Sequence, residues 1–334
     1  MKNIVRVIEE QCDKIGGVLK QVKIRPDFME REFLNVKADR ETKLRMYFMA
    51  AAICHQTYSL HNDKLNLWGW DYMEYGFLEM LKSASALFNP GYICMSDPDE
   101  ITYYLQKTFS PDGNPKNCTL DSLAERTDML IEICKLVKEN NHSSITELID
   151  GCGGRLVNNG KGLYDVLQQF KAFSDPHKKK ITFFLKLATD AGLIRIKDPE
   201  NIIPIMDYHM QRVILRMGCV EILDENLRKE LTAKTIQRSD EPIRTACIVA
   251  VKIISDVSGH SIISINDFFW PLGRSCCNET TLCHDGSCMK NPCSFDLLVE
   301  LENHNKCIFE GVCRGSNDKK YRDLWEPVVK THYY

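Results

Sequence analysis

Seven of the chain's 15 cysteines lie between Cys276 and Cys313, and no other feature of the sequence constrains the fold as much. The other eight are scattered singly, as small buried apolar residues usually are. Seven reduced thiols in one exposed segment would oxidise readily, so we expect a metal to hold several of them. Thiolates suit an iron–sulfur cluster, and on chemistry alone they suit structural zinc equally well.

Outside this segment the composition is that of an ordinary globular protein. Of 334 residues, 44% are hydrophobic and 27% are charged, which excludes wholesale disorder, collagen and a coiled coil. The longest apolar run, Met46 to Cys54, has about nine residues, whereas a membrane helix needs ~20. The first residues have no long apolar core of the kind that a signal peptide carries. We therefore expect a cytoplasmic protein that does not associate with membranes.

The spacing of apolar residues predicts a mainly α fold. Residues 162–222 indicate a helix, a turn, a second helix, a loop and a third helix, and no alternating strand pattern is sustained anywhere. We expect a helical body over residues 1–270, with two lobes built from discontinuous pieces of chain. Residues 271–334 are expected to form a cysteine-rich metal-binding loop and a C-terminal tail.

An acidic residue, Asp207, follows Pro204 at the start of an amphipathic helix. A carboxylate at this position is stabilised by the positive end of the helix dipole as an N-cap. The plain interpretation is a cap and nothing more. The alternative is a catalytic carboxylate that stabilises a developing cation.

Three consecutive lysines, Lys178 to Lys180, lie at the start of the preceding helix. Cations at a helix N-terminus are electrostatically unfavourable, so this run suits contact with phosphate. One of the lysines could also act as a nucleophile, because a partly desolvated amine loses its proton more easily. The plain interpretation is a solvated basic face.

Taken together and in this order, these features resemble the helix-hairpin-helix DNA glycosylase superfamily. Its signature is a hairpin, a lysine that opens the second helix, and a loop ending in Val-Asp-x-His-x-x-Arg; residues 206–212 read Met-Asp-Tyr-His-Met-Gln-Arg. The Asp-Tyr pair after Ile-Pro-Ile is similar to the archaeal 8-oxoguanine glycosylase branch. The resemblance implies that Asp207 is the catalytic aspartate and that Lys179 or Lys180 is the Schiff-base lysine. The register of the following apolar residues favours Lys179. The family's hairpin glycines are missing here.

The cysteine segment adds a second resemblance, to the endonuclease III and adenine glycosylase branches. There Gly-Arg-x-x-Cys supplies the first ligand of a [4Fe–4S] cluster and a Cys-x5-Cys pair closes the set. Gly273 to Cys277 and Cys307 to Cys313 match these two elements. The resemblance implies four cluster ligands, which we expect to be Cys277, Cys293, Cys307 and Cys313. Cys283 and Cys288 are the alternatives to Cys293, and zinc is the alternative to the cluster.

A third similarity lies near the N-terminus, where the archaeal branch lines its base pocket with a glutamine and a tryptophan. The resemblance implies that Gln56 and Trp68 bind the base, with Trp70 as the alternative to Trp68. An extruded base needs a flat apolar surface and an amide that reads its polar edge.

The resemblance as a whole implies a base-excision repair glycosylase with AP lyase activity. We expect it to act as a monomer on DNA and to remove a damaged base, an oxidised purine such as 8-oxoguanine, through lysine and aspartate chemistry. Two alternatives stay open. The net charge of −3 and the missing hairpin glycines suggest an N-glycosidase for a modified nucleoside or nucleotide. The cysteine segment alone is also compatible with a non-catalytic, metal-stabilised interaction protein.

Overall fold

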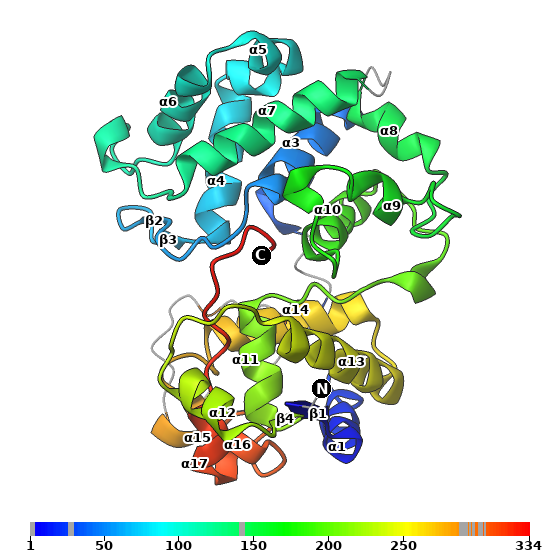
Figure 1. The fold of residues 1–334 in the computed structure, drawn as a ribbon, viewed down its shortest axis with the longest axis vertical. Coiled ribbons are helices and arrows are strands. Elements are labelled where there is room, and N and C mark those ends of the chain that lie inside the picture. Colours follow the sequence, from blue (N-terminus) through cyan, green and yellow to red (C-terminus); the bar gives the residue numbers. More distant parts are fainter. Residues whose placement is uncertain are drawn as a thin grey trace. The chain divides into compact units, whose positions relative to one another are not determined.

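The structure is a computed structural model that describes residues 4–25, 30–139, 144–286, 293, 295, 298–299, 303 and 305–334. Helices dominate the described chain, and the strands are two or three residues long (Figure 1). The expected mainly α class is confirmed. Among the described residues, no single helix is long and apolar enough to cross a membrane. The helices Glu241–Ser258 and Ile262–Arg274 reach that length and composition only together, and a bend of 113° separates them.

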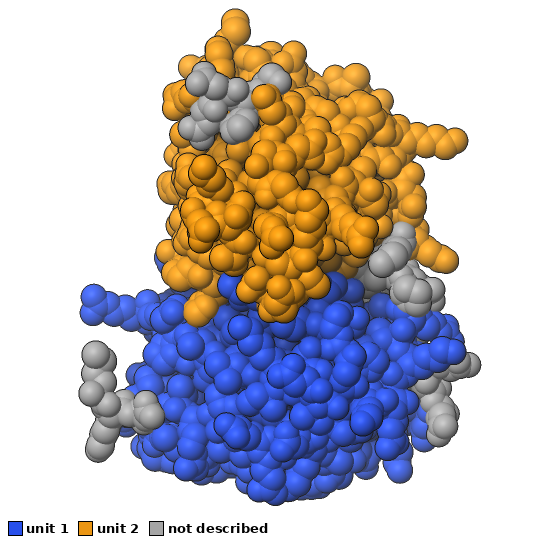
Figure 2. Space-filling view, turned by 90° about the vertical axis from the view of Figure 1, so that its right-hand side faces the viewer, with its two compact units in different colours: residues 1–28, 203–330 blue, residues 29–202, 331–334 orange. Residues whose placement is uncertain are grey.

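The chain divides into two compact units, each built from discontinuous segments (Figure 2). Unit 1 comprises residues 1–28 and 203–330, and unit 2 comprises residues 29–202 and 331–334. The boundary expected at residue 270 therefore falls inside unit 1. Asp207 and the cysteine segment belong to unit 1, and the lysines belong to unit 2.

Unit 2 contains the longer run of helices. Its α-helices are α2 (Glu32–Asn35), α3 (Arg40–Ala52), α4 (Trp70–Lys82), α5 (Pro90–Met95), α6 (Pro98–Thr108), α7 (Leu123–Glu139), α8 (Ile145–Gly151), α9 (Leu163–Leu167) and α10 (Lys179–Asp190). Its 3-10 helices are η2 (Ala86–Phe88), η3 (Pro115–Asn117), η4 (Lys171–Phe173) and η5 (Pro199–Asn201), and its strands β2 (His61–Asn62) and β3 (Leu67–Trp68) pair antiparallel.

Helix α3 forms the centre of unit 2. Asp39 caps its N-terminus by accepting a hydrogen bond from the Thr42 amide, and every residue from Met46 to Cys54 is buried. A helix that is apolar on all sides has to be surrounded by other elements. Phe48 meets this requirement by stacking on Phe173 at 4.6 Å between ring centroids and by packing edge-on against Phe184 of α10. The end of α3 is thereby fixed beside the start of α10.

The turn before α10 differs from the expected one. The Ser-Asp-Pro sequence suggests that the helix starts near residue 177, but α10 begins at Lys179 and ends at Asp190. Lys178 adopts a left-handed conformation, with φ of 59°, and therefore lies outside the helix. Only the second and third lysines of the run are helical, so their side chains leave the turn in different directions from that of Lys178.

Unit 1 is assembled from the N-terminal segment and the C-terminal part of the chain. Its elements are β1 (Val5–Val7), α1 (Glu9–Leu19), α11 (Tyr208–Met217), β4 (Val220–Ile222), α12 (Glu225–Thr232), α13 (Glu241–Ser258), α14 (Ile262–Arg274), α15 (Leu282–Asp285), α16 (Arg314–Asn317) and α17 (Lys319–Arg322). Strands β1 and β4 pair antiparallel, with Val5 opposite Ile222.

Glycines allow close helix packing in unit 1, among them Gly16 and Gly273. A Cβ at Gly16 of α1 would lie 2.8 Å from Val257 of α13, so the glycine lets these helices approach each other. A Cβ at Gly273 of α14 would lie 3.0 Å from the His209 carbonyl oxygen and 3.2 Å from Val213 of α11. The glycine of the Gly-Arg-x-x-Cys motif is therefore the point where α14 meets the Asp-Tyr-His helix.

We expect Gly273→Ala to destabilise unit 1 by about 1–3 kcal/mol, because the added methyl group meets backbone that cannot move without shifting α11. Gly17→Ala is the matched control, since a Cβ there has no atom within 4 Å and removing a helical glycine should stabilise by roughly 0.5–1 kcal/mol. Urea unfolding measures both changes. Equal stability of the two variants would contradict this account of the packing.

Candidate functional site

Lys180 of unit 2 is a completely buried lysine. Its Nζ donates hydrogen bonds to the Ala52 carbonyl at the end of α3, at 2.6 Å, and to His55 Nδ1, at 3.2 Å. Burial lowers the pKa of Lys180 to about 7; the positive charges of Lys179 and Arg126 act in the same direction. The lowered pKa favours the neutral amine, which is the form that a nucleophile requires.

Lys179, the first residue of α10, has different surroundings. Its side chain is 7% exposed, and its Nζ lies 3.7 Å from Cys54 Sγ and 5.3 Å from the centre of the Phe183 ring. Both lysines predicted from the sequence thus face the segment that follows α3. They differ in access, which is greater for Lys179.

Arg126 of α7 fixes the segment that faces the lysines. It is fully buried and donates hydrogen bonds to the carbonyl oxygens of Ile53 and His55 and to the Asp121 carboxylate. The carbonyl groups at the C-terminal end of α3 lack helical partners, and a guanidinium with five donors can satisfy several of them. Arg126 thereby holds His55 in place beside Lys180.

The turn that precedes the lysines is closed by its own carboxylate. Asp175 is completely buried, and its oxygens accept hydrogen bonds from the backbone amides of His177, at 3.0 Å, and Lys179, at 2.8 Å. These amides lie at the start of α10, and free N–H groups at the start of a helix attract anions. An internal carboxylate occupies them instead.

The residues predicted to bind a base follow α3 in the chain, and the structure does not group their side chains together. Gln56 is half-buried, has a φ of 42°, and donates its backbone N–H to the Tyr334 carbonyl. Trp68 is 46% exposed and stacks on His61 at 4.9 Å in the β2–β3 hairpin. Trp70 is buried, packs edge-on against Phe183 at 4.6 Å, and donates to Glu74. Of the two tryptophans, Trp70 lies on the ring that Lys179 contacts.

Asp207 of unit 1 is the N-cap of α11, as its position in the sequence predicts. Its Oδ1 accepts a hydrogen bond from the Met210 amide at 3.0 Å, and the residue is 6% exposed. Burial raises the pKa of the neighbouring Tyr208, and the Asp207 charge contributes in the same direction. The carboxylate is thus held in a low-dielectric environment at the positive end of a helix, where a cation forming nearby would interact with it strongly.

Arg212 connects the Asp-Tyr-His helix to the cysteine segment within unit 1. Its guanidinium donates to the Gly273 carbonyl at 2.8 Å, to the Cys277 carbonyl at 3.1 Å and to the buried Glu326 at 2.5 Å. It also lies within 3.0 Å of His209 Nδ1. The last residue of the aspartate motif therefore fixes the first and the last residue of the Gly-Arg-x-x-Cys frame.

Four cysteines of unit 1 lie on two short turns. The backbone of Cys277 pairs with Thr281, which turns the chain so that Cys283 follows nearby, and Phe309 accepts the Cys313 amide in the second turn. Burial raises the pKa of the Cys307 thiol, and the thiols of Cys277, Cys313 and Cys283 raise it further by charge repulsion. Burial also raises the pKa of Cys313 to about 12, with Cys277 as the next cause.

The donor chemistry of these four thiols fits an iron–sulfur cluster. Two Cys-x5-Cys turns carry four sulfurs, and the Arg216 guanidinium lies 3.7 Å from Cys277 Sγ. Cys293 packs against the same apolar core, and Cys288 lies outside the described residues. Among the described side chains, no group of three or more histidines, cysteines or carboxylates is arranged to hold a single metal ion.

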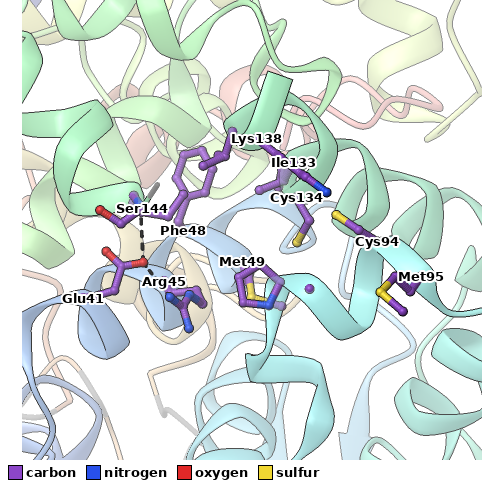
Figure 3. A pocket seen from close by; sticks show the side chains of 14 residues that line it. Glu41, Arg45, Phe48, Met49, Cys94, Met95, Ile133, Cys134, Lys138 and Ser144 are labelled. Carbon is purple, nitrogen blue, oxygen red and sulfur yellow. Dashed lines mark hydrogen bonds and ion pairs between the residues drawn. The ribbon is translucent and has the colours of Figure 1, made fainter. Parts of the chain in front are cut away.

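An apolar cavity of about 250 Å³ lies elsewhere in unit 2, between α3, α5, α7 and α8 (Figure 3). Phe48 and Met49 form one wall, and Cys94 and Cys134 lie next to each other on another. Pockets for small ligands usually measure ~300–1,000 Å³. None of the residues predicted from the sequence to act in catalysis, base binding or metal binding lines this cavity.

Three residues near the lysines were not predicted from the sequence: His55, Glu125 and His332. They come from the end of α3, from α7 and from the C-terminal segment, so no local spacing connects them. A lone histidine or glutamate carries no signal of its own in a sequence. Only the Cys-His-Gln run at residues 54–56 marks this part of the chain as unusual.

We expect Lys180→Met to stabilise the protein at pH 7 by roughly 2–4 kcal/mol, because it removes a costly buried amine while keeping its volume. The folded pKa of about 7 is lower than the ordinary 10.5, so the unfolded chain holds one more proton between these pH values and wild-type stability rises with pH. The advantage of the variant should therefore shrink from pH 7 to pH 9 in urea unfolding. Lys135→Met, an exposed position of α7, should show no such trend, and a constant advantage for Lys180→Met would contradict the lowered pKa.

Comparison with known protein families and with curated proteins finds no match to this chain. The roles of Asp207, the lysines and the cysteines therefore depend on their own surroundings and on the resemblance of short motifs.

Proposed function

We propose that this protein is a DNA base-excision glycosylase with AP lyase activity that removes an oxidised purine such as 8-oxoguanine. The observation that carries the proposal is the completely buried lysine at the start of α10, whose Nζ bonds to the Ala52 carbonyl and to His55 Nδ1 and whose pKa burial lowers. In the proposed reaction the amine attacks the anomeric carbon of the damaged nucleotide. A carbon–nitrogen bond forms, the glycosidic bond breaks, and the base leaves with the electron pair and takes up a proton.

Ring opening of the sugar then gives an imine between the lysine and the sugar carbon, and this imine permits strand cleavage by β-elimination. Lys180 has the lowered pKa, and Lys179 has the greater access. Attack by Lys180 requires the surrounding chain to open, because its side chain is fully buried in this structure. We assign the nucleophile to this pair and favour Lys180 for its protonation state.

Asp207 is proposed to stabilise the positive charge that develops on the sugar as the base departs. The N-terminus of α11 and the hydrogen bond from the Met210 amide favour a negative charge at this buried position. Gln56 is proposed to read the polar edge of the base, and Trp68 or Trp70 to supply a flat apolar surface for it.

The cysteine segment is proposed to hold a [4Fe–4S] cluster with a structural role. Three of the ligands expected from the sequence also lie on the two short turns described above: Cys277, Cys307 and Cys313. For the fourth ligand we propose Cys283, because its thiol interacts electrostatically with the other three. Cys293, the ligand expected from the sequence, is the alternative. The cluster would stabilise the loop that Arg212 connects to the Asp207 helix. Zinc remains the alternative metal.

One observation favours a second candidate function, an N-glycosidase that acts on a modified nucleoside or nucleotide. Helix-hairpin-helix glycosylases use backbone amides of the hairpin to bind a DNA phosphate, as the resemblance implies. In this chain Asp175 occupies the amides of His177 and Lys179, and its negative charge repels phosphate. Such an enzyme would keep the lysine and Asp207 and would need no duplex-binding surface.

The chemistry is tested by borohydride trapping, which reduces the imine to a stable amine. We expect a covalent adduct between the protein and a duplex containing 8-oxoguanine, lost in Lys180→Gln. Asp207→Asn should slow adduct formation by about 100-fold, because it removes the charge that stabilises the cation. Lys135→Gln, an exposed lysine on α7, is the matched control and should form the adduct normally.

The same experiment separates the two candidate functions. Release of base from a modified nucleoside, without adducts on the duplex and without salt-dependent duplex binding, would favour the second candidate. Absence of adduct and of base release with all substrates would favour the interaction protein.

The metal proposal predicts about four irons per chain and a broad absorbance band near roughly 400 nm in protein purified without oxygen. Cys283→Ser should lose most of this iron, because it removes one of four ligands, whereas Cys293→Ser should retain it. Cys134→Ser, a cysteine of unit 2, is the control. Loss of iron in Cys293→Ser but not in Cys283→Ser would support the ligand set expected from the sequence, and zinc without colour would exclude the cluster.

A further inference from the structure

We propose that His55 and Glu125 form a proton path between the Lys180 amine and the surface of unit 2, with His332 as a second partner of Glu125. The inference rests on the proposed function for the role of the amine as a nucleophile. The path itself is defined by contacts within unit 2. His55, Glu125 and His332 are positioning residues in this scheme, because they act on the substrate only through Lys180.

The contacts form a continuous chain. Lys180 Nζ lies 3.2 Å from His55 Nδ1, and His55 Nε2 lies 3.5 Å from Glu125 Oε2. The other carboxylate oxygen of Glu125 lies 3.6 Å from His332 Nδ1, and His332 Nε2 lies 3.2 Å from Ser174 Oγ in the turn before α10. Exposure rises along this chain, from 0% for Lys180 and 2% for His55 to 39% for the Glu125 side chain.

The position of the protons follows from these partners. Lys180 is a donor, so His55 Nδ1 must accept, and a neutral imidazole then carries its proton on Nε2, facing Glu125. Burial keeps His55 neutral by lowering its pKa, and the nearby Lys180 and Arg126 charges add to this effect. Within the part of the chain that the structure describes, His55 Nε2 makes no hydrogen bond, and the Glu125 carboxylate lies 3.5 Å from it. The ring is thus placed to accept at one nitrogen and to donate at the other.

The charged and titratable groups around Lys180 come from every element packed against it. They are Cys54 and His55 after α3, Lys179 on α10, Glu125 and Arg126 on α7, and His332 in the C-terminal segment. Glu125 and Cys54 favour the ammonium form, and Lys179 and Arg126 oppose it. Glu125 combines an exposed carboxylate with contact to the ring that Lys180 touches, so it is the exit to solvent.

The proton step is balanced in atoms and charge. The Lys180 ammonium gives a proton to His55 Nδ1 while His55 Nε2 gives its proton to the Glu125 carboxylate, which passes it to water. The amine becomes neutral and free to form a bond to carbon, and His55 ends as the other neutral tautomer. Water is the only co-reactant.

Glu125→Gln gives opposite results for a proton path and for a purely electrostatic role. Removing the Glu125 charge lowers the pKa of Lys180 further, so an electrostatic role predicts equal or faster trapping at pH 6. A proton path predicts trapping slowed by about tenfold or more at pH 6, where the amine must lose a proton, and much less at pH 8.5, where it is already neutral. Asp128→Asn, an exposed carboxylate on the same helix, should change neither rate.

A second readout needs no substrate. Carbon-13 NMR of the lysine Cε atoms should show one lysine that titrates near pH 7, is absent in Lys180→Met, and shifts to lower pH in Glu125→Gln. If no lysine titrates below about pH 9, or if Glu125→Gln traps as well as wild type at pH 6, the path is overturned.

The two readouts separate failure of the path from failure of the proposed function. Trapping that persists in Lys180→Gln and is lost in Lys179→Gln would overturn the path and leave the glycosylase proposal standing. A lysine that titrates near pH 7, but no adduct with any duplex or nucleoside, would overturn the proposed function while keeping the lowered pKa of Lys180 on which the path depends.

Discussion

Arg212 is a completely buried guanidinium, and much of unit 1 is organised by the need to satisfy its five N–H groups. An unpaired buried charge is costly, so each acceptor has to be held in position. Glu326 supplies the counter-charge, and the carbonyl oxygens of Gly273 and Cys277 supply further acceptors. Because Arg212 is one turn from Asp207 on α11, the same interactions also orient the helix that presents the carboxylate. The two motifs found in the sequence are therefore parts of one buried hydrogen-bond network.

Unit 2 uses a buried arginine for a similar purpose. Arg126 binds the carbonyl groups after α3, which puts His55 and Cys54 against the two lysines. As a result, burial lowers the pKa of the Lys180 amine, which lies beside the neutral imidazole of His55. Such an arrangement opposes folding, since the unfolded lysine is freely hydrated and protonated. A group that costs stability and has a strongly perturbed pKa is more typical of a functional site than of a packing site.

The sequence predicts the local features of this fold and misses those that depend on distant residues. The helix over residues 208–217, its aspartate cap and its end at Gly218 follow from short-range patterns, and the structure agrees. The start of α10 was misplaced because Asp175 and Pro176 look like a helix start, whereas the Asp175 carboxylate instead closes a turn and delays the helix to Lys179. The partners of Lys180 could not be predicted, because His55, Glu125 and His332 meet only through tertiary packing. The choice between Cys283 and Cys293 depends likewise on a turn that spacing alone does not define.

The same turn also bears on the kind of substrate that the lysines can meet. In a duplex-binding hairpin the amides before the catalytic lysine are left for a phosphate, and the local charge is positive. Here a fully buried carboxylate takes those amides, and burial makes it difficult to displace, since Asp175 would lose both hydrogen bonds. Any phosphate close to Lys179 must therefore be bound by side chains. Lys178 adds little to this, because its amine bonds to Gln168 at the end of α9. A duplex would have to be held mainly by other surfaces, whereas a single nucleotide needs no extended phosphate-binding surface.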